Sequence, residues 1–153
     1  MYFLGLDPGF VSGAWGCIDH AGNYMGCGDI EHDDYRVLAR PLRKALLGVI
    51  PDLETAWIVI EQVGPMPKQG MASTAKFMRA AGCIEAVAEL TGFKTFYVTP
   101  QVWKKNYFLM DAAKNDSLDI AREKWIAAPL GKKKYHNRAE ALLIALWGLQ
   151  NLS

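Results

Sequence analysis

The order in which strand and helix patterns follow one another restricts the fold of this chain more than any other feature of its sequence. Short apolar runs at 2–7 and 56–61 indicate buried strands, and the second run is rich in β-branched residues. Runs at 12–18 and 24–30 flank the hairpin-forming residues 19–23. The first three strands are therefore predicted to form an antiparallel meander, and 56–61 to form a central parallel strand.

Helices and strands alternate through the rest of the chain. The spacing of apolar residues predicts a helix over 33–49, in which Pro41 is expected to cause a kink or a new start. After a Gly/Pro-rich loop, the pattern predicts a long helix, a strand and three further helices, at 72–91, 94–98, 99–107, 114–126 and 136–152. This order predicts an α/β fold, with a mixed five-stranded sheet flanked by helices, of the ribonuclease H-like type.

Length and composition indicate one domain over residues 1–153, with 51% hydrophobic and 22% charged residues. The apolar N-terminal run is interrupted by Asp7 and has no basic segment before it, and ALLIALW is too short to span a bilayer. The three cysteines lack the spacing of paired metal ligands, which favours free thiols. We therefore expect a cytoplasmic protein that does not bind membranes.

Positive and negative charges are separated along the chain, although the total is only +1. Residues 1–93 carry a net charge of −4, whereas residues 94–138 carry a net charge of +6. A basic block beside acidic residues fits a polyanionic substrate held near a metal site. A solvated, charged helical face is the alternative explanation for any single lysine.

Three acidic residues that are far apart in the sequence occupy positions suited to a shared metal site. Asp7 and Glu61 each end a predicted strand, and ligands gather at the carboxyl ends of parallel strands. Glu140 lies in an apolar helix, one turn from His136 and Asn137. Several carboxylates that converge suit two Mg²⁺ ions about 3.5–4 Å apart, which catalyse phosphodiester hydrolysis.

Each of these residues also has an explanation without a metal. Asp7 is followed by Pro-Gly and suits a turn, and Glu61 suits a surface ion pair. His136 suits a helix start, whereas Glu140 is expected to be partly buried, which is costly unless it is paired or bound to a metal.

With these residues placed, the chain resembles the RuvC family of Holliday junction resolvases, and in particular a compact phage-type member. The resemblance covers nearly the whole chain and rests on the ordered segments LGLDPG, SGAWG, IVIEQV, STAKFMRAAGCIEAVAEL, VTPQVWKK and HNRAEALLIALW. It implies a homodimer that nicks two strands of a four-way DNA junction with Mg²⁺ or Mn²⁺ and needs no small-molecule cofactor. The catalytic residues it implies are Asp7, Glu61, Glu140, Asn137 and the functional lysine Lys114, with Lys104 or Lys105 near a second lysine position.

The sequence departs from the family pattern at three places. Glu140 stands where many relatives carry Asp, and the neutral Asn137 stands at the fourth acidic position, so Asn137 or His136 is expected to complete the metal site. The loop after Glu61 lacks the aromatic residue with which bacterial members wedge into the junction, which leaves Met66 or Met71 as an apolar wedge. Forks or other branched DNA are therefore also expected substrates.

Further residues are expected to contact DNA or a second subunit. The predicted phosphate contacts are Lys68, Ser73, Thr74, Lys76, Lys104, Lys105, Lys114, Lys132, Lys133 and Lys134. The small residues Ala80, Ala81, Gly82 and Ala86 suit close helix packing, either in a dimer or against the sheet. Two alternatives to the nuclease stay open: a non-catalytic protein that binds branched nucleic acid, favoured by Asn137, and an actin-like ATPase, suggested by LGLDPG alone.

Overall fold

The protein is built on a five-stranded mixed sheet with the strand order β3-β2-β1-β4-β5. The computed structural model describes residues 1–9, 12–31, 34–51, 54–65, 68 and 70–153, and for Lys114 the backbone alone. The strands are β1 (Tyr2–Asp7), β2 (Ser12–Asp19), β3 (Tyr24–Glu31), β4 (Ala56–Glu61) and β5 (Lys94–Val98). All five agree with the predicted ranges to within one residue.

Strand directions follow the predicted scheme. β1, β2 and β3 form an antiparallel meander, whereas β1, β4 and β5 run parallel to one another. Leu6 on β1 pairs with Ile60 on β4, so the next residue of each strand, Asp7 and Glu61, ends its strand at the same edge of the sheet. This parallel pairing of the central strands brings the two predicted acids together.

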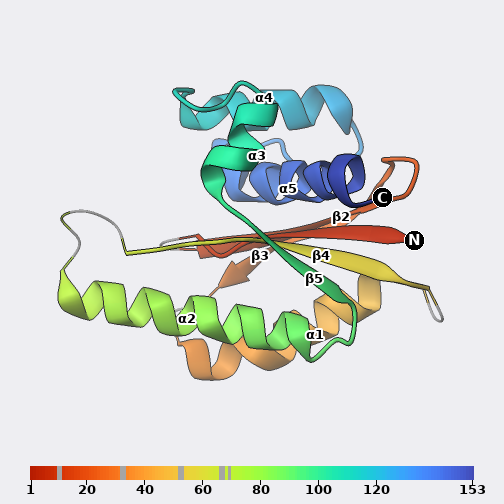
Figure 1. Ribbon diagram of the computed structural model, residues 1–153. Coiled ribbons are helices and arrows are strands. Elements are labelled where there is room, and N and C mark those ends of the chain that lie inside the picture. Colours follow the sequence, from red (N-terminus) through yellow and green to blue (C-terminus); the bar gives the residue numbers. More distant parts are fainter. Residues whose placement is uncertain (10–11, 32–33, 52–53, 66–67, 69) are drawn as a thin grey trace.

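Two layers of helices cover the two faces of the sheet. Helices α1 and α2 lie on one face, and α5 lies on the other, with α3 and α4 stacked outside it (Figure 1). Their bounds are α1 (Tyr35–Val49), α2 (Met71–Glu89), α3 (Pro100–Asn106), α4 (Lys114–Lys124) and α5 (His136–Leu152), and a single 3₁₀ turn, η1 (Lys133–Tyr135), leads into α5. This arrangement confirms the ribonuclease H-like fold.

Helix α1 begins two residues later than predicted, at Tyr35. Asp34 caps it by accepting a hydrogen bond from the backbone N–H of Arg36 at 3.0 Å. Pro41 lies inside the helix without ending it. The reason is the apolar stripe of this helix, which is buried against the sheet at Leu38, Leu42 and Leu46 and offsets the one backbone donor that proline removes.

The alternation of side chains along the central strands divides the core into two parts. Leu4 and Leu6 face α1 and α2, whereas Phe3 faces α5, and the same alternation holds for Ile58, Val59 and Ile60 on β4. All of these side chains are buried, so both strands are covered on both faces, as expected for central strands between two helix layers.

Helix α5 lies unusually close to the sheet because glycines face it. Gly5 on β1 pairs across the strands with Gly16 on β2. A Cβ atom on Gly5 would lie 1.9 Å from the carbonyl oxygen of Ala141, and one on Gly16 would lie 2.8 Å from the backbone nitrogen of Leu142. These two glycines therefore fix the height of α5, and with it the position of the adjacent Glu140.

In the described part of the chain, every helix falls short of the length and hydropathy that a bilayer span requires.

Candidate active site

Two buried carboxylates end the central strands on the face that α5 covers. Asp7 lies two residues after Gly5 and so faces the same side of β1, toward α5. Glu61 likewise shares the face of Val59 on the neighbouring strand. Asp7 is only 3% exposed and Glu61 only 8%, which is rare for acids that are not held in a network.

The turn after Asp7 is shaped by contacts that only glycine allows. The backbone N–H of Gly9 donates to Oδ1 of Asp7 at 3.0 Å, and Gly9 has a φ of +50°. A Cβ atom on Gly13 would lie 2.5 Å from the backbone oxygen of Asp7. The turn is therefore packed tightly against the start of β2, which fixes the Asp7 carboxylate.

The third acid, Glu140 on α5, completes an electrostatically coupled group. Burial raises the pKa of Asp7 well above its usual value, and the negative charges of Glu61 and Glu140 raise it further. Burial also raises the pKa of Glu61, and Glu140 adds to this rise. Three carboxylates repel one another at this edge of the sheet, so the site favours a bound cation.

Two neighbours on α3 oppose this repulsion. The indole N–H of Trp103 donates to Oε1 of Glu61 at 2.8 Å and lowers the pKa of that carboxyl. The ammonium of Lys104 lies 3.9 Å from Oε1 of Glu140, and its charge lowers the pKa of both Asp7 and Glu61. Trp103 is fully buried, and the Lys104 side chain is 31% exposed.

The donor set fits a hard divalent cation, although its present arrangement is not a closed cage. Within the described ranges, no three His, Cys, Asp or Glu side chains are already grouped around one metal position. Glu61 and Glu140 instead contact protein groups, the indole of Trp103 and the ammonium of Lys104. Buried carboxylate oxygens that carry raised pKa values are nevertheless ligands that suit Mg²⁺ or Mn²⁺.

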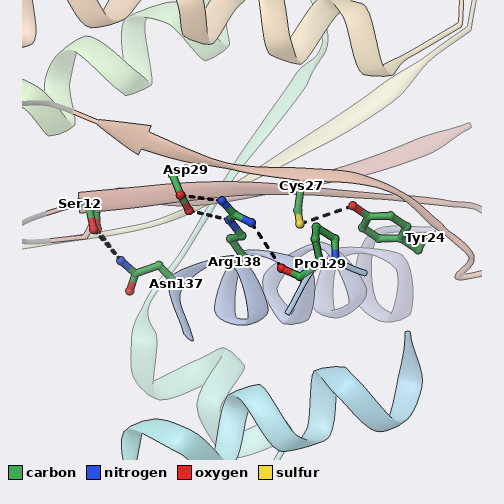
Figure 2. Close-up of polar contacts among 7 residues, drawn as sticks. All are labelled: Ser12, Tyr24, Cys27, Asp29, Pro129, Asn137 and Arg138. Carbon is green, nitrogen blue, oxygen red and sulfur yellow. Dashed lines mark hydrogen bonds and ion pairs between the residues drawn. The ribbon is translucent and has the colours of Figure 1, made fainter. Parts of the chain in front are cut away.

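The first turn of α5 is tied to the sheet at two points (Figure 2). The side-chain amide of Asn137 donates to the carbonyl oxygen of Ser12 at 2.6 Å and to its hydroxyl at 3.2 Å. Arg138 forms a bidentate ion pair with Asp29, with both hydrogen bonds at 2.7 Å. The amide nitrogen of Asn137 therefore links α5 to the start of β2, the strand that pairs with β1. Only the side-chain carbonyl oxygen of Asn137 is left to face a ligand.

The other predicted site residues lie on α3, at the start of α4 and around the start of α5. His136 begins α5 and is half-buried, one turn before Glu140. Lys104 reaches the acids, whereas Lys105 on the same helix is exposed. Lys114 begins α4, but its side chain lies outside the described residues, as does Met66 altogether. Lys132, Lys133 and Lys134 are exposed just before α5.

The remaining predicted contacts gather at the start of α2. Ser73 and Lys76 are exposed there, Thr74 is half-buried, and Lys68 precedes the helix in the loop after β4. Met71 is 90% exposed at the first position of α2. Because the loop follows Glu61 directly, α2 begins near the end of β4 that carries Glu61, although the helix covers the opposite face of the sheet from α5 (Figure 1).

Sequence reasoning missed the residues that hold the acids in place. Trp103 is a fully buried core residue, and its N–H also binds Glu61. The one available signal was its position directly before Lys104 in VTPQVWKK. Ser12, Arg138 and Asp29 gave no signal, because each acts through a contact more than 100 residues away.

Comparison with known proteins identifies similar chains, although no protein-family model matches this one. The crossover junction endodeoxyribonuclease RuvC of Bradyrhizobium sp. (strain BTAi1) is 30% identical over 149 residues, which cover 94% of this chain and 83% of that protein. The RuvC protein of Rhodopseudomonas palustris (strain TIE-1) is 31% identical with the same coverage.

Solved structures share the fold at lower sequence identity. The structure of Thermus thermophilus RuvC superposes with a TM-score of 0.68 at 18% identity, covering 95% of this chain and 92% of that one. The same protein in complex with a Holliday junction substrate gives a TM-score of 0.69 at 17% identity, over 95% of this chain and 90% of that one.

Proposed function

Since this chain belongs to the RuvC family of crossover junction endodeoxyribonucleases, we propose that it resolves four-way DNA junctions by hydrolysing one phosphodiester bond in each of two strands. The observation that carries this proposal is the convergence of Asp7, Glu61 and Glu140 from two strand ends and one helix. The relatives cover this chain almost completely, so the same catalytic domain is compared throughout.

In this proposal Asp7, Glu61 and Glu140 hold two Mg²⁺ or Mn²⁺ ions, with the carbonyl oxygen of Asn137 or the imidazole of His136 as a further ligand. Metal ions in such a site supply an activated water and stabilise the charge on the leaving oxygen. Glu61 is held for this role by Trp103, which fixes one of its two carboxylate oxygens at 2.8 Å. Asn137 positions the turn that carries Asp7, through Ser12.

The lysines are proposed to bind DNA phosphates. Lys104 lies beside the acids, so its ammonium is placed to bind the phosphate group next to the scissile bond once the carboxylates have other partners. Further phosphate contacts are proposed in the basic segment 94–138, at Lys105, Lys114, Lys132, Lys133 and Lys134, and around the start of α2, at Lys68, Ser73, Thr74 and Lys76. Such contacts give affinity for any DNA, so selectivity must come from the shape of the branch.

A homodimer is proposed because symmetric cleavage needs two sites. Helix α2 supports it with an exposed stripe on one face, made of Met71, Ala75, Met78, Gly82 and Ala86. Of the small residues named for dimer contact, Ala80 and Ala81 are instead buried against this subunit's own sheet, whereas Gly82 and Ala86 face outward. As a nuclease that acts on DNA, the protein would work in the cytoplasm, that of a bacterial host if a phage encodes it.

The experiment compares a synthetic four-way junction, a fork and a linear duplex of matched sequence, in Mg²⁺, Mn²⁺ or EDTA. We expect paired nicks of like polarity in the junction, slower cutting of the fork, none in the duplex, and none in EDTA. Cleavage of all three substrates at similar rates would contradict junction resolution.

A second candidate function is a non-catalytic protein that binds branched DNA, and the neutral Asn137 favours it. It predicts wild-type protein that binds the four-way junction tightly but leaves both strands intact in either metal. The comparison of cleavage in Mg²⁺, Mn²⁺ and EDTA described above separates this function from that of a nuclease. An actin-like ATPase is not supported, because that architecture uses two copies of the domain and the described residues form one.

A further inference from the structure

Phe108 combines an exposed aromatic side chain with a left-handed backbone conformation. Its side chain is 95% exposed, which is the highest value among the large apolar residues of the described chain. Its φ is +58°, a left-handed conformation that aromatic residues rarely adopt. Neither feature stabilises the fold, since an exposed ring buries nothing and a left-handed backbone at a residue with a Cβ atom is strained.

The strain arises from the way α3 ends. The backbone N–H of Leu109 donates to the carbonyl of Lys104 at 2.9 Å, and that of Phe108 donates to Lys105 at 3.3 Å. This pair of hydrogen bonds is the Schellman ending of a helix, in which the left-handed position is normally glycine. Glycine would satisfy the same two bonds without strain, so the phenyl ring must serve something outside the folded monomer.

The backbone at Phe108 is connected to residues that contact the acids. Lys104, whose ammonium lies 3.9 Å from Glu140, is one turn before Phe108 and is bonded to the next residue, Leu109. Leu109 is buried, and Trp103 on the same helix is fully buried and bonded to Glu61. A rigid segment therefore carries Phe108 outward from the catalytic group.

The surroundings of the ring select its partner. Phe108 lines an open hollow of about 440 Å³ together with Lys105, Met110 and Ala112, and with the acids Asp111 and Asp116. The two carboxylates of the lining disfavour a phosphate in the hollow itself, whereas the single ammonium of Lys105 favours one beside it. A flat, neutral nucleobase with an attached phosphate matches both conditions, because bases stack on aromatic rings in single strands and at distorted steps.

We propose that Phe108 stacks on an unpaired or unstacked base of the branched DNA, next to the strand that enters the active site. The inference rests on the proposed function and adds to it a residue that senses the branch, from the segment between α3 and α4. It gives this chain an aromatic contact where the loop after Glu61 has none.

The test uses Phe108→Ala, Phe108→Gly and Phe108→Trp, with Ile126→Ala as a matched control because Ile126 is also exposed, at 92%. Each protein is titrated against a four-way junction that carries 2-aminopurine at the branch, and against a matched duplex. We expect wild type to change the fluorescence of the 2-aminopurine when it binds, and Ala and Gly to weaken junction binding between about fivefold and one-hundredfold and to reduce that change. Trp should retain both, and the control should match wild type.

Stability separates this role from a structural one. Phe108→Gly relieves the left-handed strain, so we expect it to melt at a higher temperature than wild type while binding the junction less well. A structural role predicts that binding and stability fall together, and that result would overturn the inference. So would sedimentation showing that Phe108→Ala turns a dimer into monomers, since the ring would then face a second copy.

The two levels of the proposal fail differently. If wild type cuts the junction, and the Ala and Gly variants bind it and change its fluorescence as wild type does, only the role of Phe108 is overturned. Wild type that neither binds nor cuts branched DNA overturns the proposed function and this inference with it.

Discussion

The indole N–H of Trp103 on α3 donates a hydrogen bond of 2.8 Å to Oε1 of Glu61, which lies 42 residues earlier, at the end of β4. Both groups are buried, so the bond lies in a region of low dielectric where it is stronger than at the surface. It engages one oxygen of Glu61 and leaves the other without this donor. The carboxylate is thus held in place before any ligand arrives.

Replacing Trp103 with Phe keeps most of the packing and removes the bond. Because the bond lowers the pKa of Glu61, the pKa should rise in the variant, and the acid limb of the cleavage rate should move to higher pH. The free energy of unfolding should fall by about 1.5–3 kcal/mol, the usual loss for a hydrogen bond to a charged group. Cleavage rates measured across pH 5–9 and urea denaturation provide the readouts.

Trp125→Phe is the matched control for this variant, since its N–H donates to the carbonyl oxygen of Gly22 at 2.9 Å, away from the acids. It should lose about 0.5–1.5 kcal/mol of stability and leave the pH profile unchanged. An unchanged profile in Trp103→Phe would show that the bond does not tune Glu61.

Asn137 is predicted to act as a tether between α5 and the turn after Asp7. In Asn137→Asp, a carboxylate would face the carbonyl oxygen of Ser12 where the amide now donates at 2.6 Å, so cleavage should fall by about tenfold or more. Asn137→Ala should fall similarly, because both lose the donor. An Asp variant that needs less Mg²⁺ and cuts faster than wild type would contradict the tether, because the added ligand charge would then matter more than the lost donor.

The coupled acids predict an inverted dependence of stability on pH in metal-free protein. Asp7 and Glu61 have folded-state pKa values above their unfolded values, so their protonated forms stabilise the fold most at low pH. The free energy of unfolding should therefore fall as pH rises from about 4 through the raised pKa values, at about 1.4 kcal/mol for each unit of pKa elevation. Thermal melts in EDTA between pH 4 and 8 measure this.

Divalent metal should reverse that loss. Mg²⁺ binds the deprotonated form of the acids, and at pH 8 it should add about 2.7 kcal/mol of stability when its concentration is one hundred times the dissociation constant. Asp7→Asn should melt higher than wild type in EDTA and gain less from Mg²⁺. Equal gains in the two proteins would place the metal elsewhere.

The close approach of α5 to the sheet predicts that Gly5 cannot be changed. In Gly5→Ala the new methyl group would meet the backbone of Ala141 and Ala145, so α5 must shift. We expect a loss of about 1–3 kcal/mol or more, and a cleavage defect because Glu140 moves with the helix. Gly48→Ala on α1 is the control, since no atom lies within 4 Å of its Cβ position, and it should gain up to about 1 kcal/mol.

Much of the fold could be predicted because local patterns and global topology agree. Apolar runs such as YFLGL and WIVI predicted the buried strands, and Pro8-Gly9 predicted the turn after β1. The helix predicted over 72–91 is present as Met71–Glu89, two residues shorter at its C-terminal end. The order of elements then left few topologies, since parallel crossovers are right-handed. The acids followed, because strand ends at one sheet edge must meet.

The rest depended on contacts that have no local signature. Gly5 and Gly16 looked like ordinary strand residues until β1 and β2 paired and placed both beneath α5. The carbonyl oxygen of Asn137 was predicted as a metal ligand, but nothing in the sequence indicated that its amide nitrogen binds Ser12, 125 residues away. Phe108 gave no signal either, since its left-handed backbone depends on where α3 ends.

The measurement that tests the central account most directly is single-turnover cleavage of a four-way junction in Mg²⁺ by wild type, Asp7→Asn, Glu61→Gln and Glu140→Gln. Glu54→Gln serves as the control, because Glu54 forms an exposed ion pair with the N-terminus. We predict that the three site variants bind the junction but cut it at least about one-hundredfold more slowly, while the control cuts like wild type. Site variants that cut at the wild-type rate would contradict the assignment of the three carboxylates as the catalytic centre.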